Sequence, residues 1–91
     1  MSKLPKNTEK EEVALYPIRT VSDLTEVNAI TLRAWERRYN LFEPVRKASG
    51  HRLYTQAHID LITRVVGLLD RGIRIGQVKA HLEIENAALN D

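Results

Sequence analysis

The sequence predicts a mainly α-helical fold of about four helices with one short two-stranded β-hairpin. Apolar residues recur at helical spacing in four segments after residue 16, which predicts the helices. One intervening segment, residues 45–54, has a strand-like pattern on both sides of a turn and predicts the hairpin. With 91 residues and no cysteine, the chain is expected to form one small domain held together by an apolar core without disulfides.

Composition divides the chain into three parts. Residues 1–15 are polar and without apolar period, which predicts a disordered tail. Residues 16–84 hold the predicted helices and hairpin, and residues 85–91 are expected to be a C-terminal tail or the start of a linker to a further effector or dimerisation module. No run approaches the roughly 18 apolar residues of a membrane span, and no secretory signal precedes the domain. We therefore expect a cytoplasmic protein without a membrane partner.

The first predicted helix lies in "YPIRTVSDLTEV". Thr20 or Ser22 is expected to cap it. The apolar residues expected to be buried by this helix are Val21, Leu24 and Val27.

The second predicted helix, "AITLRAWERRY", follows after about three residues, a spacing typical of a helix-turn-helix. Asn28 is expected to cap it, and Asn40 to end it in a left-handed conformation. On a helical wheel it has an apolar stripe of Leu32, Trp35 and Tyr39. The opposite side holds Arg33, Ala34 and Arg37, with Thr31 and Arg38 on one flank and Glu36 on the other. Spacing explains Trp35 as a core residue, and its indole N–H could also reach a phosphate from the edge.

The predicted hairpin follows Pro44. Val45 and Arg46 form its first strand, Arg52, Leu53 and Tyr54 its second, and Gly50 allows a positive φ in the turn between them. A hairpin of this size is marginally stable alone, so it must pack on the helices. A basic hairpin beside a basic helix predicts a winged helix-turn-helix.

Two further helices complete the predicted scaffold. Thr55 is expected to cap the first, which buries Ile59, Ile62, Val66 and Leu69 and ends at Gly72. The second buries Ile75, Val78 and Leu82. His58 and His81 lie in different helices without Asp, Glu or Cys at metal-ligand spacing, so neither predicts a metal site.

Positive charge concentrates in one part of the chain. The whole chain has a net charge of +2, whereas residues 33–52 alone hold six basic and two acidic side chains. The basic ones are Arg33, Arg37, Arg38, Arg46, Lys47 and Arg52. Such a block is typical of a polyanion-binding surface, and a solvated charged face is the alternative. The conjunction of a basic helix with a basic hairpin favours the binding surface.

The run "TLRAWERRY", followed by the pattern P-x-R-x-x-x-G-H-R-L-Y, resembles the amino-terminal DNA-binding domain of MerR-family bacterial transcriptional regulators. It is most similar to the branch with "AWERRY", which includes cobalamin-dependent light-responsive repressors of carotenoid genes and related curli and blue-light regulators. The resemblance covers about residues 16–82. It implies sequence-specific binding of double-stranded DNA, with the second helix in the major groove.

The resemblance also implies roles for individual residues. Arg33 and its neighbours would enter the major groove, Arg46 and Arg52 would contact phosphates, and His51 would reach toward the minor groove. In the wider family an aromatic pair that touches the DNA backbone usually occupies positions 34 and 35; here Ala34 departs from this pattern and leaves Trp35 as the candidate. The complete set of expected DNA-binding residues is Thr31, Arg33, Trp35, Arg37, Arg38, Arg46, Lys47, His51, Arg52 and Tyr54.

The sequence also bears on cofactors, on dimerisation and on alternative functions. We expect no cofactor, because there is no cysteine for a metal effector and no Asp-x-His cobalamin motif. Family members typically continue into a dimerisation helix or effector domain, so we expect dimerisation through a region missing from this chain, which is either an excised domain or a stand-alone DNA-binder. An alternative function is protein interaction, with an acidic antirepressor on the basic face. Without paired carboxylates, an activated nucleophile or a phosphate-binding glycine loop, the sequence does not predict an enzyme.

Overall fold

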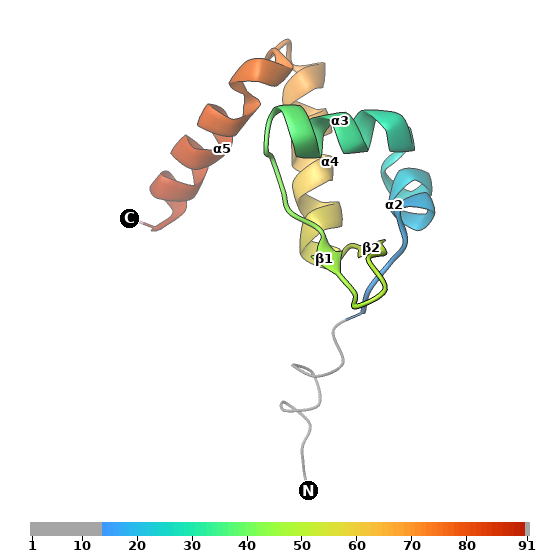
Figure 1. The fold of residues 1–91 in the computed structure, drawn as a ribbon. Helices are drawn as coiled ribbons and strands as arrows, with labels where there is room; N and C mark the ends of the chain where they lie inside the picture. Colours follow the sequence, from blue (N-terminus) through green and yellow to red (C-terminus); the bar gives the residue numbers. More distant parts are fainter. Residues whose placement is uncertain (1–13, 91) are drawn as a thin grey trace, which may run out of the picture.

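The structure is a computed structural model that describes residues 14–90, and it confirms the predicted fold class. Four helices and a two-stranded hairpin follow one another along the chain (Figure 1). They are α2 (Ile18–Thr25), α3 (Ala29–Arg38), β1 (Val45–Arg46), β2 (Arg52–Leu53), α4 (Gln56–Asp70) and α5 (Ile75–Asn90). The disordered tail expected at residues 1–15 lies almost entirely outside the described residues. No helix of residues 14–90 has the length and apolar character needed to cross a bilayer.

Helix α2 begins earlier than predicted. Pro17 is its N-cap, without a side-chain cap, so Thr20 and Ser22 lie inside the helix and the predicted cap was wrong. The fixed φ of proline and its missing N–H suit a helix start. The backbone N–H groups of Thr20 and Val21 both donate to the Pro17 carbonyl, at 3.0 and 3.2 Å.

The burial expected for α2 was correct in part. Val21 is fully buried, but Leu24 is 60% exposed. The helix ends at Thr25, and Glu26 takes a left-handed conformation with φ 61°, so Val27 reaches the core from the turn and not from the helix. With the helix in this register, Ile18 and Val21 point to the core and Leu24 falls outside that stripe.

Both predicted ends of α3 are confirmed. The Asn28 side chain accepts hydrogen bonds from the backbone N–H groups of Ile30 and Thr31, at 2.8 and 3.2 Å. At the other end Asn40 has φ 52° and reverses the chain. The reversal brings Leu41 and Phe42 into the core, where they are 8% and 7% exposed.

The hairpin forms from the predicted strand segments, and it pairs Val45 with Leu53 and Arg46 with Arg52. Gly50 has φ 89°, as the turn requires. Tyr54, expected to be part of the second strand, instead forms an isolated bridge with Tyr16, through two backbone hydrogen bonds of 2.7 and 2.8 Å. The segment before α2 therefore supplies a third strand position that the sequence did not predict.

Helix α4 is the centre of the core and packs on α2 and on α5 (Figure 1). Thr55 caps it as predicted, and the His58 side chain accepts a reciprocal hydrogen bond from the Thr55 N–H at 3.0 Å. The residues of α4 that are buried are Ile59, Ile62, Val65 and Leu68. Ile59 and Ile62 were predicted, whereas Val66 and Leu69, expected in place of Val65 and Leu68, are only partly buried and pack against the core cluster.

After α4, Gly72 takes the predicted positive φ, at 95°. Val78 and Leu82 of α5 are buried and Ile75 is partly buried, in agreement with the sequence. Helix α5 continues to Asn90, so residues 85–90 are helical.

The cap at Asn28 allows a test of the helix-turn-helix. Asn28→Ala removes the acceptor for two N–H groups at the start of α3 and should lower the free energy of unfolding by about 1 kcal/mol. Asn86→Ala, in the exposed interior of α5, is the matched control and should raise it by a few tenths, up to about 0.7 kcal/mol, through helix propensity. Urea unfolding followed by circular dichroism measures both. Equal midpoints for the two variants would contradict the cap.

Candidate nucleic-acid interface

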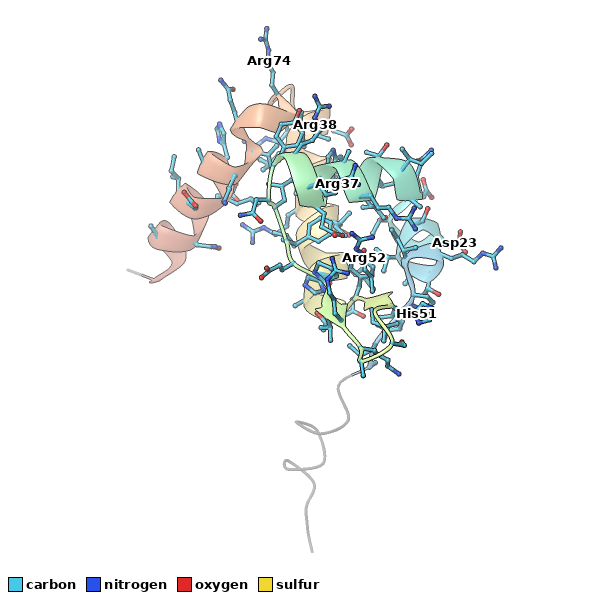
Figure 2. The ribbon with its side chains drawn as sticks, in the orientation of Figure 1. Asp23, Arg37, Arg38, His51, Arg52 and Arg74 are labelled. Carbon is cyan, nitrogen blue, oxygen red and sulfur yellow. The ribbon has the colours of Figure 1, made fainter. Side chains whose placement is uncertain are left out.

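Basic side chains of α3 and of the hairpin line the same two surface hollows. Figure 2 shows Arg37 on α3, Arg52 below it and His51 at the hairpin tip, in that order along the molecule. We call this surface the basic face and define it by Arg33, Arg37, Arg46, His51 and Arg52, together with the exposed residues next to them in sequence, Arg38 and Lys47. The structure brings together four of the six basic residues of the 33–52 block, Arg33, Arg37, Arg46 and Arg52, which line two hollows that share Arg52.

Helix α3 contributes three exposed arginines, Arg33, Arg37 and Arg38. Leu32 and Trp35 are 0% and 7% exposed on its opposite side, which confirms the predicted amphipathic helix. Thr31, also expected in the site, is half-buried in the first turn.

The hairpin contributes the remaining basic residues. Arg46, Lys47 and His51 are exposed, and the ring Nδ1 of His51 lies 2.8 Å from the Ser49 hydroxyl. Arg52 is half-buried, and Tyr54 is fully buried. Tyr54 therefore lies behind the basic face and not on it.

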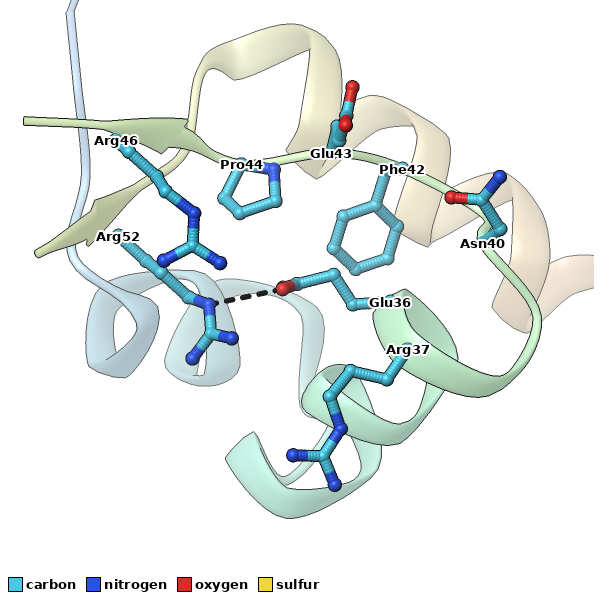
Figure 3. Close-up of a pocket in the computed structure, with 8 residues that line it drawn as sticks. All are labelled: Glu36, Arg37, Asn40, Phe42, Glu43, Pro44, Arg46 and Arg52. Atoms are coloured by element: carbon cyan, nitrogen blue, oxygen red, sulfur yellow. Dashed lines mark ion pairs between the residues drawn. The ribbon is translucent and has the colours of Figure 1, made fainter. Parts of the chain in front are cut away.

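Two hollows flank Arg52. The larger, of about 520 Å³, lies between the end of α3 and the hairpin (Figure 3). Its lining residues are Glu36, Arg37, Asn40, Phe42, Glu43, Pro44, Arg46 and Arg52. The smaller, of about 330 Å³, is lined by Pro17, Ile18, Arg33, Gly50, His51 and Arg52. Arg52 thus separates the hollow beside Arg37 from the hollow beside Arg33.

Glu36 joins α3 to the hairpin, a role that the sequence did not predict. It is 8% exposed, and its Oε2 accepts a hydrogen bond of 2.9 Å from the Tyr54 hydroxyl. Its Oε1 lies 3.1 Å from Arg52 Nε, drawn as the dashed line in Figure 3. The Arg52 Nε–H is buried but not aligned for a hydrogen bond, so this contact is an ion pair only. Wheel geometry placed Glu36 on a flank of α3 but could not show that the hairpin covers that flank.

Aromatic packing holds Tyr54, the hydrogen-bond partner of Glu36, in place. Tyr54 packs edge-on against Phe42 and against His58, with ring centroids 6.1 and 5.7 Å apart. The cluster connects the end of β2, the segment after α3 and the start of α4. It therefore fixes the angle between α3 and the hairpin.

Burial and the hydrogen bond to the Glu36 carboxylate raise the pKa of Tyr54 to about 12, from an ordinary value of 10.0. The nearby positive charge of Arg52 acts in the opposite direction and is the smaller effect. The phenol therefore remains a hydrogen-bond donor throughout the neutral range.

The sequence profile of the MerR HTH family of regulatory proteins matches residues 16–84. The chain belongs to this family. The match includes α2, α3, the hairpin, α4 and most of α5, so it covers the entire basic face. It confirms the resemblance inferred from the sequence.

Individual relatives agree with the assignment. The chain is 45% identical over 74 residues to the HTH-type transcriptional regulator MlrA of Escherichia coli K12. The aligned segment covers 81% of this chain and 30% of MlrA. It is 33% identical over 70 residues to the repressor CarA of Myxococcus xanthus, covering 75% of this chain and 24% of CarA. For the repressor CarH of the same organism the identity is 34% over 62 residues, covering 68% and 21%. The chain thus spans less than a third of these relatives, whose names are those of transcription regulators and not of enzymes.

The raised pKa of Tyr54 predicts how stability depends on pH. The proton is held more tightly in the folded state, so its stabilisation is complete below about pH 10 and is lost as the pH rises toward 12. Tyr54→Phe lacks this titration but also loses the hydrogen bond to Glu36. The wild-type domain should be about 1 kcal/mol more stable than the variant at neutral pH, and this gap should shrink by about 1 kcal/mol on going to about pH 11. Urea unfolding at the two pH values measures it, and a constant gap would contradict the shifted pKa.

Proposed function

We propose that residues 16–84 bind double-stranded DNA in a sequence-specific manner as the DNA-binding domain of a transcription regulator. The observation that carries the proposal is the basic face itself: Arg33 and Arg37 of α3 and Arg46 and Arg52 of the hairpin line two hollows that share Arg52. One of the two acidic residues of the 33–52 block, Glu36, is withdrawn from solvent beneath this face. The family assignment and the names of the relatives support the same function.

In this proposal α3 enters the major groove, which is wide enough for one helix. Arg33 and Arg37 project from the side opposite the buried Leu32 and Trp35. Their guanidinium groups can donate two hydrogen bonds to guanine O6 and N7. Thr31 and Arg38 flank them and contact the DNA backbone at the two ends of the helix.

The hairpin acts as the wing. Arg46 and Lys47 are exposed and contact phosphates, which hold the domain in register without reading sequence. His51, at the tip, reaches toward the minor groove. Arg52, between the two hollows, contacts a phosphate at the junction of helix and wing.

Trp35 and Tyr54 take positioning roles in the proposal. Trp35 is 7% exposed and Tyr54 is fully buried, so neither offers DNA an extended surface. Tyr54 holds Glu36 instead, and Trp35 anchors α3 to the core. The proposal therefore keeps them in the site as the support for the arginines.

The whole regulator extends beyond this domain in the proposal. The relatives are more than three times as long as the matched segment, which leaves room for an effector module and for dimerisation outside residues 16–84. Two copies of the domain would then read two half-sites of one operator.

An acidic protein could occupy the same basic face, because a surface suited to one polyanion suits another. The two partners differ in one respect: DNA offers base edges for Arg33 and Arg37 to contact, and an acidic protein does not. Chemical-shift mapping with a duplex should perturb Arg33 and Arg37 in a sequence-dependent manner, whereas an acidic protein offers no base edges.

The first test of DNA binding is its salt dependence. If most of the six basic residues contact phosphates, log K should fall with log salt at a slope of about −3 to −5, since each neutralised phosphate contributes roughly 0.9. Fluorescence anisotropy with a labelled duplex at several salt concentrations measures the slope. Lys79→Ala, on α5 outside the basic face, is the charge-matched control and should leave the slope unchanged. Tight binding with a slope near zero would show that the basic face is not the DNA-binding surface.

The second test separates base reading from phosphate contact. Arg33→Ala or Arg37→Ala should cost about 1–3 kcal/mol on a duplex selected by the wild-type domain and relax the preference at one base pair. Arg46→Ala should weaken selected and shuffled duplexes by similar factors and make the slope shallower by about one unit. Arg46 is a cleaner choice than Arg52, whose removal would also leave Glu36 without its ion partner. A changed sequence preference in Arg46→Ala alone would reverse the assigned roles.

A further inference from the structure

Glu36 is a buried carboxylate on the helix proposed to read DNA. Among the residues that the structure describes, it is the one charged side chain in the buried core, and it lies between the exposed Arg33 and Arg37 on α3. A negative charge there opposes the attraction of the basic face for phosphate. We therefore expect Glu36 to have a role that offsets this loss of attraction.

Both carboxylate oxygens of Glu36 are committed to residues at the hairpin. Oε2 accepts the Tyr54 hydroxyl at 2.9 Å, and Oε1 lies 3.1 Å from Arg52 Nε. Tyr54 is itself fully buried and bridged to Tyr16, so it cannot follow a moving wing. The Glu36 side chain is thereby held in one orientation.

The contacts of Glu36 with Tyr54 and Arg52 also connect α3 to the hairpin. Helix α3 packs on α2, and the strands of the hairpin pack on each other, whereas few close backbone contacts join α3 to the two strands. The side chains of Glu36, Tyr54 and Arg52 span the space between them. Restraining Arg52 thus restrains the cation that lines both hollows.

We propose that Glu36 is a positioning residue that exchanges affinity for specificity: it holds Arg52 in one orientation and lowers its attraction for phosphate in general, so that Arg52 contacts a phosphate only when α3 lies correctly in the groove. The proposal rests on the DNA-binding function proposed above. An unrestrained arginine adapts to any phosphate, whereas a restrained one contacts a phosphate at a single distance from the reading helix. The ion pair has side chains only 28% and 6% exposed, so salt screens it less than a surface pair.

Glu36→Gln tests this role, because the amide keeps the size of the side chain and can still accept the Tyr54 hydrogen bond but loses the charge. Relative to wild type, binding to a shuffled duplex should stay equal or strengthen up to about threefold, and the salt slope should steepen by up to about one unit. Preference for the selected duplex over the shuffled one should fall by about three- to tenfold. A residue with only a structural role would instead weaken both duplexes and leave the slope unchanged.

Two further variants sharpen the test. Glu43→Gln removes the exposed carboxylate that lines the larger hollow and is the matched charge control. It should strengthen binding to both duplexes by similar factors and retain the preference. Arg52→Lys keeps the charge but not the Nε contact, so it should lose preference without a steeper slope, and it carries the test if Glu36→Gln fails to fold. An equal loss of preference in Glu43→Gln, or full preference in Arg52→Lys, would overturn the proposal.

A measurement without DNA separates this proposal from the proposed function. In the free wild-type domain the Arg52 Nε–H should give a distinct, slowly exchanging nuclear magnetic resonance signal, which Glu36→Gln should shift toward the exposed arginines. An unchanged signal would refute the restraint whether or not the domain binds DNA. If the signal changes as expected but the wild-type domain shows no salt-dependent binding to any duplex, the DNA-binding function fails and the restraint on Arg52 stands.

Discussion

The arrangement of the domain depends on the complete burial of Tyr54. Its backbone bridges Tyr16 before the first helix, its ring packs on Phe42 and His58, and its hydroxyl donates to Glu36. These contacts bring together the chain before α2, the end of α3 and the start of α4. Phenylalanine could supply the packing but not the hydrogen bond, so Glu36 of α3 would lose its contact with Tyr54 and keep only the ion pair with Arg52.

Arg33, Arg37, Arg46 and Arg52 lie around two hollows that share Arg52, so their positive charges are held close together. Like charges repel, and a flexible face would relieve that repulsion by spreading. Here the charges rest on rigid supports: α3 is anchored by Leu32 and Trp35, and the hairpin by Tyr54. Specificity in DNA recognition requires such support, because a base contact discriminates only when the donor has few alternative positions.

Local sequence signals predicted most of the fold. Asn28 and Gly50 are short-range determinants of a cap and a turn, and the wheel of α3 correctly separated buried from exposed residues apart from Glu36. Contacts between residues distant in sequence could not be predicted in this way. The exposure of Leu24, the strand position of Tyr16 and the burial of Glu36 all depend on which element packs against them. The sequence therefore predicted the arginines of the basic face, but it did not predict the buried carboxylate that pairs with Arg52.

The bridge between Tyr16 and Tyr54 has a consequence for the order of folding. It joins two segments separated by both helices of the helix-turn-helix and by the hairpin, and closing so long a loop costs entropy before the contact rewards it. The helices form from local interactions, whereas the hairpin gains stability only after the chain has closed around it. We therefore expect the hairpin to become ordered after the helices. A partly folded chain would already contain α3 with its arginines, but the basic residues of the hairpin would not yet lie beside them. The complete basic face therefore exists only in the fully folded domain.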